Sequence, residues 1–249
     1  MAFSKREAPN CSLCPYQKNC LFSYLDKSSQ KEWKEIRIAN RFRKGETIFH
    51  EGENPPGLYV VCTGKAKIYK TSRTGDQLLT RVEEPGDLLG HRSLLAQENY
   101  SGEATAMQET VVSLIDTDNF FNFLNKHFNA CLALLKALSL DVRRGEEKAR
   151  DIAYKPAKGR LSEILVRTMH KNGSPVYGKN LDSQPSLREG KLLVSGYKRK
   201  ELAEMAGLTV ETTVRMIRQF EKQGLLKKQG KDLQILDEKR LRLLSGNLS

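Results

Sequence analysis

The spacing of apolar residues changes along the chain, and each pattern predicts a different kind of structure. A short helix is expected over Ser29–Ile38. From there to residue 118, brief apolar runs such as LYVVC and TVVSLI alternate with glycine-containing turns. Short strands separated in this way are typical of a small β-roll or barrel. Apolar residues at helical spacing take over from residue 119, so the pattern predicts an α+β chain.

The helical segment 119–153 contains an a/d heptad repeat. Apolar or small residues alternate spacings of four and three along Leu124, Phe128, Cys131, Leu135, Leu138, Val142, Gly145, Ala149 and Ile152. This repeat is typical of coiled-coil packing, so we expect a symmetric homodimer. The residues expected in its interface are Leu135, Leu138, Val142 and Ala149. The alternative is a helix packed only on its own domain, for which Leu132 and Leu134 supply a second apolar face.

Residues 196–224 predict two helices joined by a tight turn. The first helix covers 198–205, and Gly207 supplies the left-handed residue with which a helix ends at little cost. Thr209 is a suitable N-cap for the second helix, Val210–Lys222. One side of this second helix is apolar, and the opposite side is charged. The pattern is that of a helix-turn-helix, and the alternative is an ordinary αα-hairpin with a solvated charged face.

The segment after the second helix favours the helix-turn-helix. Two short runs, Leu225–Lys228 and Leu233–Leu236, flank a polar turn and predict the β-hairpin known as a wing. Residues 191–249 hold 13 Lys and Arg against 7 Asp and Glu, and the whole chain has a formal net charge of +12. A basic surface of this kind favours an anionic partner, here double-stranded DNA.

The outward residues of the helix-turn-helix predict how DNA is contacted. Glu211 can accept from cytosine N4, Arg215 can pair with guanine O6 and N7, and the methyl groups of Val214 suit a thymine methyl. Basic residues elsewhere on this surface contact phosphate. A two-fold dimer predicts a near-palindromic operator with half-sites about one turn apart. The candidate DNA-binding residues are Thr209, Glu211, Thr212, Val214, Arg215, Arg218, Lys198 and Arg199.

Three of the five cysteines are crowded near the N-terminus, where Cys11, Cys14 and Cys20 have the spacing C-x2-C-x5-C. The first two place their thiolates on one turn, and the third can close over the same ion or cluster. Zinc, an iron–sulfur cluster and metal-free redox chemistry all fit this spacing. Cys62 continues the apolar phase of its strand, which favours a buried core thiol, and Cys131 falls on the heptad repeat.

The sequence LTVETTVRMIRQFEKQGLL resembles the recognition helix of the CRP/FNR superfamily of bacterial transcription regulators, especially its FNR-like members, and the resemblance covers nearly the whole chain. It implies a cyclic-nucleotide-binding-type β-roll sensor domain, a long dimerisation helix, a C-terminal winged helix-turn-helix and contact with RNA polymerase. Glu211 and Arg215 match the family's base-reading positions, and Val142 matches a dimerisation position.

The resemblance also implies that the three N-terminal cysteines are ligands of an oxygen-sensitive 4Fe–4S cluster. The family has a fourth cysteine near the end of the β-roll, and a serine stands at the matching place here. The fourth ligand is therefore left open between water, Ser113, Asp116 and Cys62. A cluster with an open or unusual fourth position makes oxygen, nitric oxide or a redox change the natural signal.

The expected sensor pocket does not match the chemistry of cAMP. Nucleotide-binding relatives have a glutamate after the pocket glycine and, further on, an arginine that pairs with the phosphate. Here His91 stands at the first place, and no arginine lies near Tyr100, although Arg92 could substitute for it. An unpaired phosphate in a closed pocket is costly, so cAMP is not expected. Haem bound through His50 or His91 is an alternative, as is zinc at the cysteines.

We expect four parts in this chain. They are an N-terminal cysteine-rich segment over 1–27, a β-roll sensor domain over 28–118, a dimerisation helix over 119–153 and a DNA-binding domain over 154–249. Pro156 marks the hinge before the last part, and a polar loop is expected over 171–190.

The predicted function is sequence-specific DNA binding that responds to a redox or gas signal through the cysteine cluster. The alternative is a regulator that senses a small molecule other than cAMP, or a haem-bound gas, in the β-roll. No paired nucleophile and base is evident, so an enzyme is not expected. The sequence shows neither an apolar run of membrane-spanning length nor a signal-peptide core, so we expect a cytoplasmic protein with no membrane partner.

Overall fold

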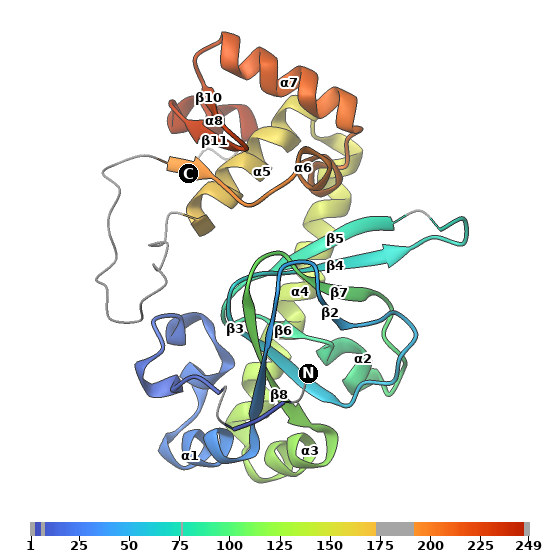
Figure 1. Ribbon diagram of the computed structural model, residues 1–249, viewed down its shortest axis with the longest axis vertical. Helices are drawn as coiled ribbons and strands as arrows, with labels where there is room; N and C mark the ends of the chain where they lie inside the picture. The colour runs from blue at the N-terminus through green and yellow to red at the C-terminus, as the bar shows by residue number, and fades with distance from the viewer. Residues whose placement is uncertain (1–2, 6–7, 76, 173–191, 247–249) are drawn as a thin grey trace. The chain divides into compact units, whose positions relative to one another are not determined.

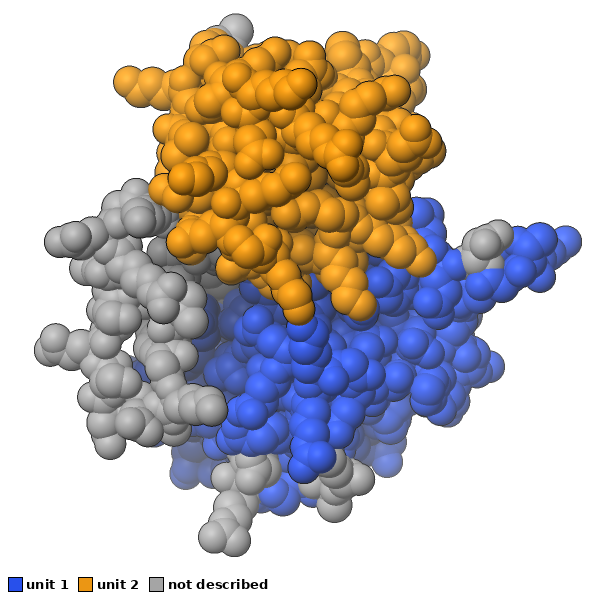
Figure 2. All heavy atoms as spheres, turned by 45° about the horizontal axis from the view of Figure 1, so that its top comes forward, with its two compact units in different colours: residues 1–145 blue, residues 146–249 orange. Residues whose placement is uncertain are grey.

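The structure is a computed structural model that describes residues 3–5, 8–75, 77–172 and 192–246. It divides into two compact units, residues 1–145 and 146–249 (Figure 2). The polar loop predicted over 171–190 lies, from residue 173 onward, outside the described residues. None of the described helices is both long enough and apolar enough to cross a bilayer.

The first unit begins with short helical turns. Three 3-10 helices and one α-helix follow each other as η1 (Cys11–Leu13), η2 (Gln17–Asn19), η3 (Leu21–Tyr24) and α1 (Lys27–Ile36). The carboxylate of Asp26 caps α1, because it accepts a hydrogen bond from the Ser29 amide at 2.9 Å. The prediction of Ser29–Ile38 for this helix was therefore wrong at both ends, and Ile38 opens the first strand instead.

Two four-stranded antiparallel sheets form the β-roll (Figure 1), which confirms the predicted fold. The first sheet has the order β1-β8-β3-β6 and contains β1 (Ile38–Phe42), β8 (Thr110–Asp116), β3 (Gly57–Thr63) and β6 (Leu88–Leu89). The second has the order β2-β7-β4-β5 and contains β2 (Thr47–Phe49), β7 (Glu103–Ala106), β4 (Ala66–Thr71) and β5 (Gln77–Glu83). Helix α2 (His91–Ala96) follows β6.

Aromatic side chains fill the inside of the roll. Phe49, Tyr59 and Tyr100 belong to one buried cluster, and the rings of Phe49 and Tyr100 stack with their centroids 3.8 Å apart. Gly90 faces this stack in the left-handed conformation, with φ +73°, and a Cβ at Gly90 would lie 2.6 Å from the Tyr100 ring. A residue without a side chain is therefore needed for the chain to pass this close to the tyrosine.

A second core covers the outer face of the first sheet. Leu58 and Val60 of β3 point to this face and belong to one buried cluster with Trp33 of α1 and Phe123. The Trp33 indole packs edge-on against the Phe123 ring at a centroid distance of 5.4 Å. Figure 1 shows α1 and α3, the helix that carries Phe123, side by side at this end of the unit. The N-terminal helices are thus held on the outer wall of the roll.

Two helices, and not the single expected helix, span residues 119–153. They are α3 (Thr117–Lys126) and α4 (Phe128–Tyr154), and His127 between them has non-helical backbone angles. Leu124 consequently belongs to α3, and the heptad repeat of α4 begins at Phe128. The imidazole of His127 contacts the Glu32 carboxylate at 2.8 Å, which ties the break to α1.

The second unit consists of helices around a small sheet. Its elements after α4 are α5 (Ala157–Asn172), β9 (Leu192–Val194), α6 (Arg199–Ala206), α7 (Val210–Lys222), β10 (Leu226–Gln229), β11 (Asp232–Ile235) and α8 (Glu238–Ser245). The three strands are antiparallel in the order β10-β11-β9. Pro156 lies in the interruption between α4 and α5, as predicted. Helix α8, which packs on α5, was not predicted.

Candidate nucleic-acid interface and cysteine site

Helices α6 and α7 form the helix-turn-helix that the sequence predicts. Gly207 ends α6 with φ +62°, and the Thr209 hydroxyl caps α7 by accepting from the Thr212 amide at 3.1 Å. Thr213, Ile217 and Phe220 are the buried side of α7. Val210 was expected on this apolar side but is 44% exposed, because it lies in the first turn beyond the packed part of the helix.

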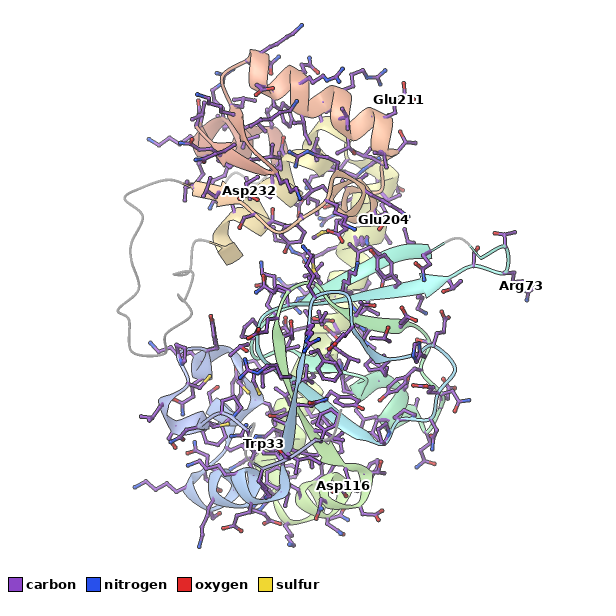
Figure 3. All side chains as sticks on the ribbon, viewed as in Figure 1. Trp33, Arg73, Asp116, Glu204, Glu211 and Asp232 are labelled. Atoms are coloured by element: carbon purple, nitrogen blue, oxygen red, sulfur yellow. The ribbon has the colours of Figure 1, made fainter. Side chains whose placement is uncertain are left out.

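The opposite side of α7 is open. Glu211, Arg215 and Arg218 are exposed, and Val214 is half-buried between them. Glu211 lies at the end of α7 next to the turn, with its side chain pointing away from the body of the unit (Figure 3). The helix N-terminus and this row of side chains form a surface that fits the edges and phosphates of a DNA groove.

The remaining residues predicted to contact DNA differ in how exposed their side chains are to a partner. Lys198 is exposed, whereas Arg199 is half-buried. Burial lowers the pKa of the Arg199 guanidinium, and the charges of Asp232 and Glu221 oppose this effect. Thr209 and Thr212 are joined by a hydrogen bond between their hydroxyls at 2.9 Å, so both take part in capping.

A β-hairpin follows α7 as the predicted wing. Residues Leu226 and Ile235 face each other at its base, and Gln229 pairs with Asp232 at its tip. Lys227, Lys228 and Lys231 are exposed on it. These lysines extend the cationic surface of the unit beyond α7.

Arg160, which is not among the predicted site residues, holds the turn in place. This arginine of α5 donates to the carbonyls of Ala206 at 2.9 Å and Gly207 at 3.2 Å, which end α6. It also donates to the carbonyls of Ile152 at 3.1 Å and Lys155 at 3.0 Å, near the end of α4. Arg160 is therefore the cationic cap of two helix ends. An arginine four residues after a helix-breaking proline is the one local signal that could have suggested it.

Helix α4 has an apolar face that no other described part of the chain covers. Leu135 is 58% exposed and Val142 is 62% exposed, while Ala130, Ala133 and Leu134 pack against the β-roll. The alternative in which Leu132 and Leu134 pack on the chain's own domain holds for Leu134, which is buried, and is wrong for Leu132, which is exposed. The residues of this face, all exposed except the half-buried Leu138, are Phe128, Leu135, Leu138, Val142, Gly145, Ala149 and Ile152, and we call them the heptad face.

A carboxylate of α4 contacts His91 and Arg92, the two residues considered above for binding a ligand in the sensor pocket. Asp141 lies 3.1 Å from His91 Nε2 and 2.7 Å from an Arg92 nitrogen. Although burial disfavours the charged carboxylate, the hydrogen bonds from His91 and Arg92 hold the pKa of Asp141 well below its usual range. Arg92 is therefore already paired and not placed to replace a phosphate-binding arginine. His50, the other histidine considered for haem, contacts Glu103 at 3.1 Å.

The cavity beside this cluster is small. It has a volume of about 130 Å³ and is lined by residues of the β-roll and α4, including Leu88, His91, Ala137 and Asp141. Pockets that enclose a small-molecule ligand are typically about 300–1,000 Å³. The space here is too small to enclose a nucleotide without rearrangement.

The N-terminal cysteines lie on consecutive tight turns. The amide of Cys14 donates to the Cys11 carbonyl at 3.3 Å, and the amide of Cys20 donates to the Gln17 carbonyl at 3.1 Å. Cys11 and Cys20 pack against the core on the outer face of the first sheet. Within the described residues, no three His, Cys, Asp or Glu side chains are arranged around one point where a single ion could sit.

Cys62 joins these thiols from the sheet. Its Sγ lies 3.0 Å from the Ser113 Oγ. Cys62 is half-buried, so the prediction of a buried core thiol was wrong. Burial raises the pKa of Cys11 to about 11, and Cys62 and Cys14 add to this effect while Arg37 opposes it. Burial likewise raises the pKa of Cys20 to about 12, with further contributions from the same neighbouring thiols.

The side chains considered for the fourth ligand are not equally placed. Ser113 accepts a hydrogen bond from Arg37 at 3.2 Å beside Cys62. Asp116 instead caps α3, because its carboxylate oxygens bind the Asn119 amide at 3.0 Å and side chain at 2.6 Å (Figure 3). Its carboxylate is engaged in this cap, which makes Asp116 the less suitable ligand.

Sequence comparison agrees with this architecture. A model described as "Cyclic nucleotide-binding domain" matches residues 39–127, and a second, described as "Crp-like helix-turn-helix domain", matches residues 159–244. The chain belongs to the CRP/FNR family of transcription regulators. Regulators of this family bind DNA and act as dimers.

Relatives in the CRP/FNR family differ in the signals that their names describe. The chain is 25% identical over 200 residues to the "CRP-like cAMP-activated global transcriptional regulator" of Mycobacterium tuberculosis, which covers 80% of this chain and 84% of that protein. It is 24% identical over 241 residues to the "Fumarate and nitrate reduction regulatory protein" of Yersinia pestis, covering 96% and 92%. The solved structure of FixK2 from Bradyrhizobium japonicum matches with a TM-score of 0.71 at 21% identity, and the match covers 86% of this chain and 100% of that one.

Proposed function

We propose that this CRP/FNR regulator binds a near-palindromic operator as a homodimer and responds to a redox or gas signal received at its N-terminal cysteines. The observation that carries the proposed signal is the packing of Cys11 and Cys20 on the outer wall of the β-roll, near the buried Arg37, which donates to the Pro9 carbonyl and to the Ser113 hydroxyl beside Cys62. Cysteine thiolates are the usual ligands of iron–sulfur clusters, which supply sensitivity to oxygen, nitric oxide and electron transfer. The residues proposed to hold a 4Fe–4S cluster are Cys11, Cys14 and Cys20 with a fourth donor.

A single zinc ion is the alternative occupant of this donor set. A zinc site needs its four ligands around one atom, and the described residues contain no such arrangement. A cluster instead takes each thiolate at a different iron atom, so its ligands are spread more widely. Iron, zinc and sulfide content of the purified protein distinguishes the two.

The DNA-binding part of the proposal rests on α7. Glu211 and Arg215 are exposed on one side of this helix, one turn apart, and can read cytosine and guanine. Arg218, Lys198 and the wing lysines contact phosphate and set the salt dependence. The heptad face of α4 meets its two-fold partner, which brings two recognition helices to successive major grooves. Contact with RNA polymerase remains a prediction from the resemblance.

Two variants of α7 test the docking. Selection from random duplexes first identifies the operator, and fluorescence anisotropy then measures affinity for the operator and its single-base variants. Arg215→Ala is expected to lose about 1–3 kcal/mol of binding and to relax preference at one base pair of each half-site. Arg218→Ala is the matched control, because it should weaken all duplexes equally and reduce the salt slope by about 1. Unchanged base preference in Arg215→Ala would contradict the assignment.

Anaerobic purification tests the signal. The protein should carry iron and acid-labile sulfide and absorb visible light, and its operator binding should change on exposure to air or nitric oxide. Cys14→Ser should lose the iron and this response together. A protein without iron whose operator binding ignores both gases would remove the proposed signal while leaving the DNA-binding function intact.

A further inference from the structure

The position of Cys62 in its strand is irregular. Strand β3 pairs with β8 residue by residue from Gly57 opposite Asp116 to Val61 opposite Val112. Thr63 then pairs with Val111, so Cys62 is the extra residue of a β-bulge. A bulge bends the strand locally and redirects the side chain at that point, and bulges are frequent next to functional sites.

The redirected thiol lies beneath the N-terminal segment. The neighbouring residue on the same face, Val60, belongs to the cluster against which Cys11 and Cys20 pack. Arg37 connects the two segments, because its guanidinium donates to the Ser113 hydroxyl at 3.2 Å and to the carbonyl of Pro9, two residues before Cys11. The Sγ of Cys62 lies 3.0 Å from the same Ser113 hydroxyl. Two segments far apart in the sequence thus bring four thiols to one region of the surface.

Arg37 is a buried positive charge with incomplete pairing. Its residue is 4% exposed, and its guanidinium donates to the Ser113 hydroxyl and the Pro9 carbonyl. Its Nε has no hydrogen-bond partner, and in the described part of the chain Arg37 makes no ion pair with a carboxylate. A buried guanidinium with an unused N–H can donate to an anion placed beside it.

We propose that Cys62 is the fourth thiolate of the metal centre held by Cys11, Cys14 and Cys20, and that Arg37 is the counter-charge of this centre. The inference deepens the proposed function and rests on it. Each thiol releases its proton to solvent on binding, and the resulting negative charge lies beside the guanidinium. Ser113 then acts as a hydrogen-bond partner of the Cys62 sulfur and not as a ligand.

This assignment explains the serine at the place of the family's fourth cysteine. Ser113 is on β8 and Cys62 is on the adjacent strand β3, with Sγ and Oγ 3.0 Å apart. A thiolate supplied from β3 therefore reaches nearly the same position as one supplied from β8. The hydroxyl is a poor ligand at neutral pH, whereas a thiol is a good one.

The test compares four full-length proteins: wild type, Cys62→Ala, Ser113→Ala and Cys131→Ala. All are purified without oxygen and reconstituted with ferrous iron and sulfide. Iron, zinc and sulfide are counted per chain, and visible absorption and electron paramagnetic resonance spectra are recorded. Cys131 is the matched control thiol, because it lies on α4, where its Sγ bonds to the Leu124 carbonyl at 3.3 Å.

Wild type, Ser113→Ala and Cys131→Ala are expected to hold about four iron atoms per chain. Cys62→Ala should lose at least about one quarter of this iron and show a 3Fe–4S resonance that the wild type lacks. If the alanine variant fails to fold by circular dichroism, Cys62→Ser keeps the side-chain volume and decides in its place. A wild-type spectrum and iron content in the Cys62 variants, or iron loss in Ser113→Ala alone, would overturn the assignment.

The outcomes separate this inference from the proposed function. Wild type that takes up iron, together with an unaffected Cys62 variant, removes only the role of Cys62. Zinc in the wild type that falls in Cys62→Ala supports the four-thiolate set and rejects the iron–sulfur cluster. Wild type that binds neither iron nor zinc removes the cluster and, with it, the assignment of Cys62.

Discussion

Replacement of Arg160 by alanine should loosen the turn that positions the recognition helix. The guanidinium makes four hydrogen bonds to backbone carbonyls, of which those to Ala206 at 2.9 Å and Lys155 at 3.0 Å are partly buried. The other two, to Ile152 and Gly207, are exposed, so water can replace them. With about 1.5 kcal/mol for each partly buried bond to a charged donor, the expected loss is about 3 kcal/mol.

Urea unfolding of the full-length protein, followed by circular dichroism, measures this loss. Hydrogen exchange adds a local measure, because the Leu208 amide donates to the Ala203 carbonyl at 2.9 Å in the same turn. Its exchange should become roughly 100-fold faster if the turn opens at the expected cost. Operator affinity should fall as well, since the productive position of α7 is populated less.

Two further variants make this result interpretable. Arg160→Lys should lie between wild type and alanine, because one ammonium cannot reach carbonyls on both helix ends. Arg167→Ala, at an exposed arginine of the same helix, should change the unfolding free energy by less than about 0.5 kcal/mol. An Arg160→Ala protein that loses no more than this control, with unchanged Leu208 exchange, would show that the cap does not hold the turn.

Three other predictions follow from the described contacts. Val142→Asp should raise the dimer dissociation constant at least about tenfold, as measured by analytical ultracentrifugation, because it places a charge in an apolar interface, whereas Val142→Leu should remain dimeric. Asp141→Asn should be less stable than wild type at neutral pH. Since the folded-state pKa of Asp141 is depressed, this difference should be full above about pH 5 and shrink as the pH falls, which urea midpoints at several pH values would show. Arg37→Gln should shift the cluster's reduction potential to more negative values in a redox titration, and by more than Lys34→Gln, because Lys34 is exposed. Equal shifts in the two variants would argue against a counter-charge role for Arg37.

Local signals made the helix-turn-helix predictable. Gly207 and Thr209 determine where α6 stops and α7 starts through their own backbone and hydroxyl, so the predicted bounds of Val210–Lys222 are confirmed. The β-roll was predictable for a similar reason, because its short apolar runs and turns recur along the sequence.

Features that depend on distant contacts could not be predicted in the same way. The four bonds of Arg160 reach up to 47 positions along the chain, and its sequence neighbours carry no trace of them. The bulge at Cys62 is a matter of pairing register, which alternation of apolar residues does not determine. His127, at the break between α3 and α4, contacts Glu32, which lies 95 positions away. The heptad pattern of apolar residues carries no signal of this contact, so it predicts one continuous helix.

The close approach of Gly90 to Tyr100 links the fates of these two positions in evolution. Any larger residue at 90 would collide with the tyrosine ring, while loss of that ring alone would leave a void beside Phe49 at a cost of about 3–5 kcal/mol. A larger side chain at 90 therefore needs a smaller one at 100, and paired variation at these two positions among related proteins would be the record of this contact.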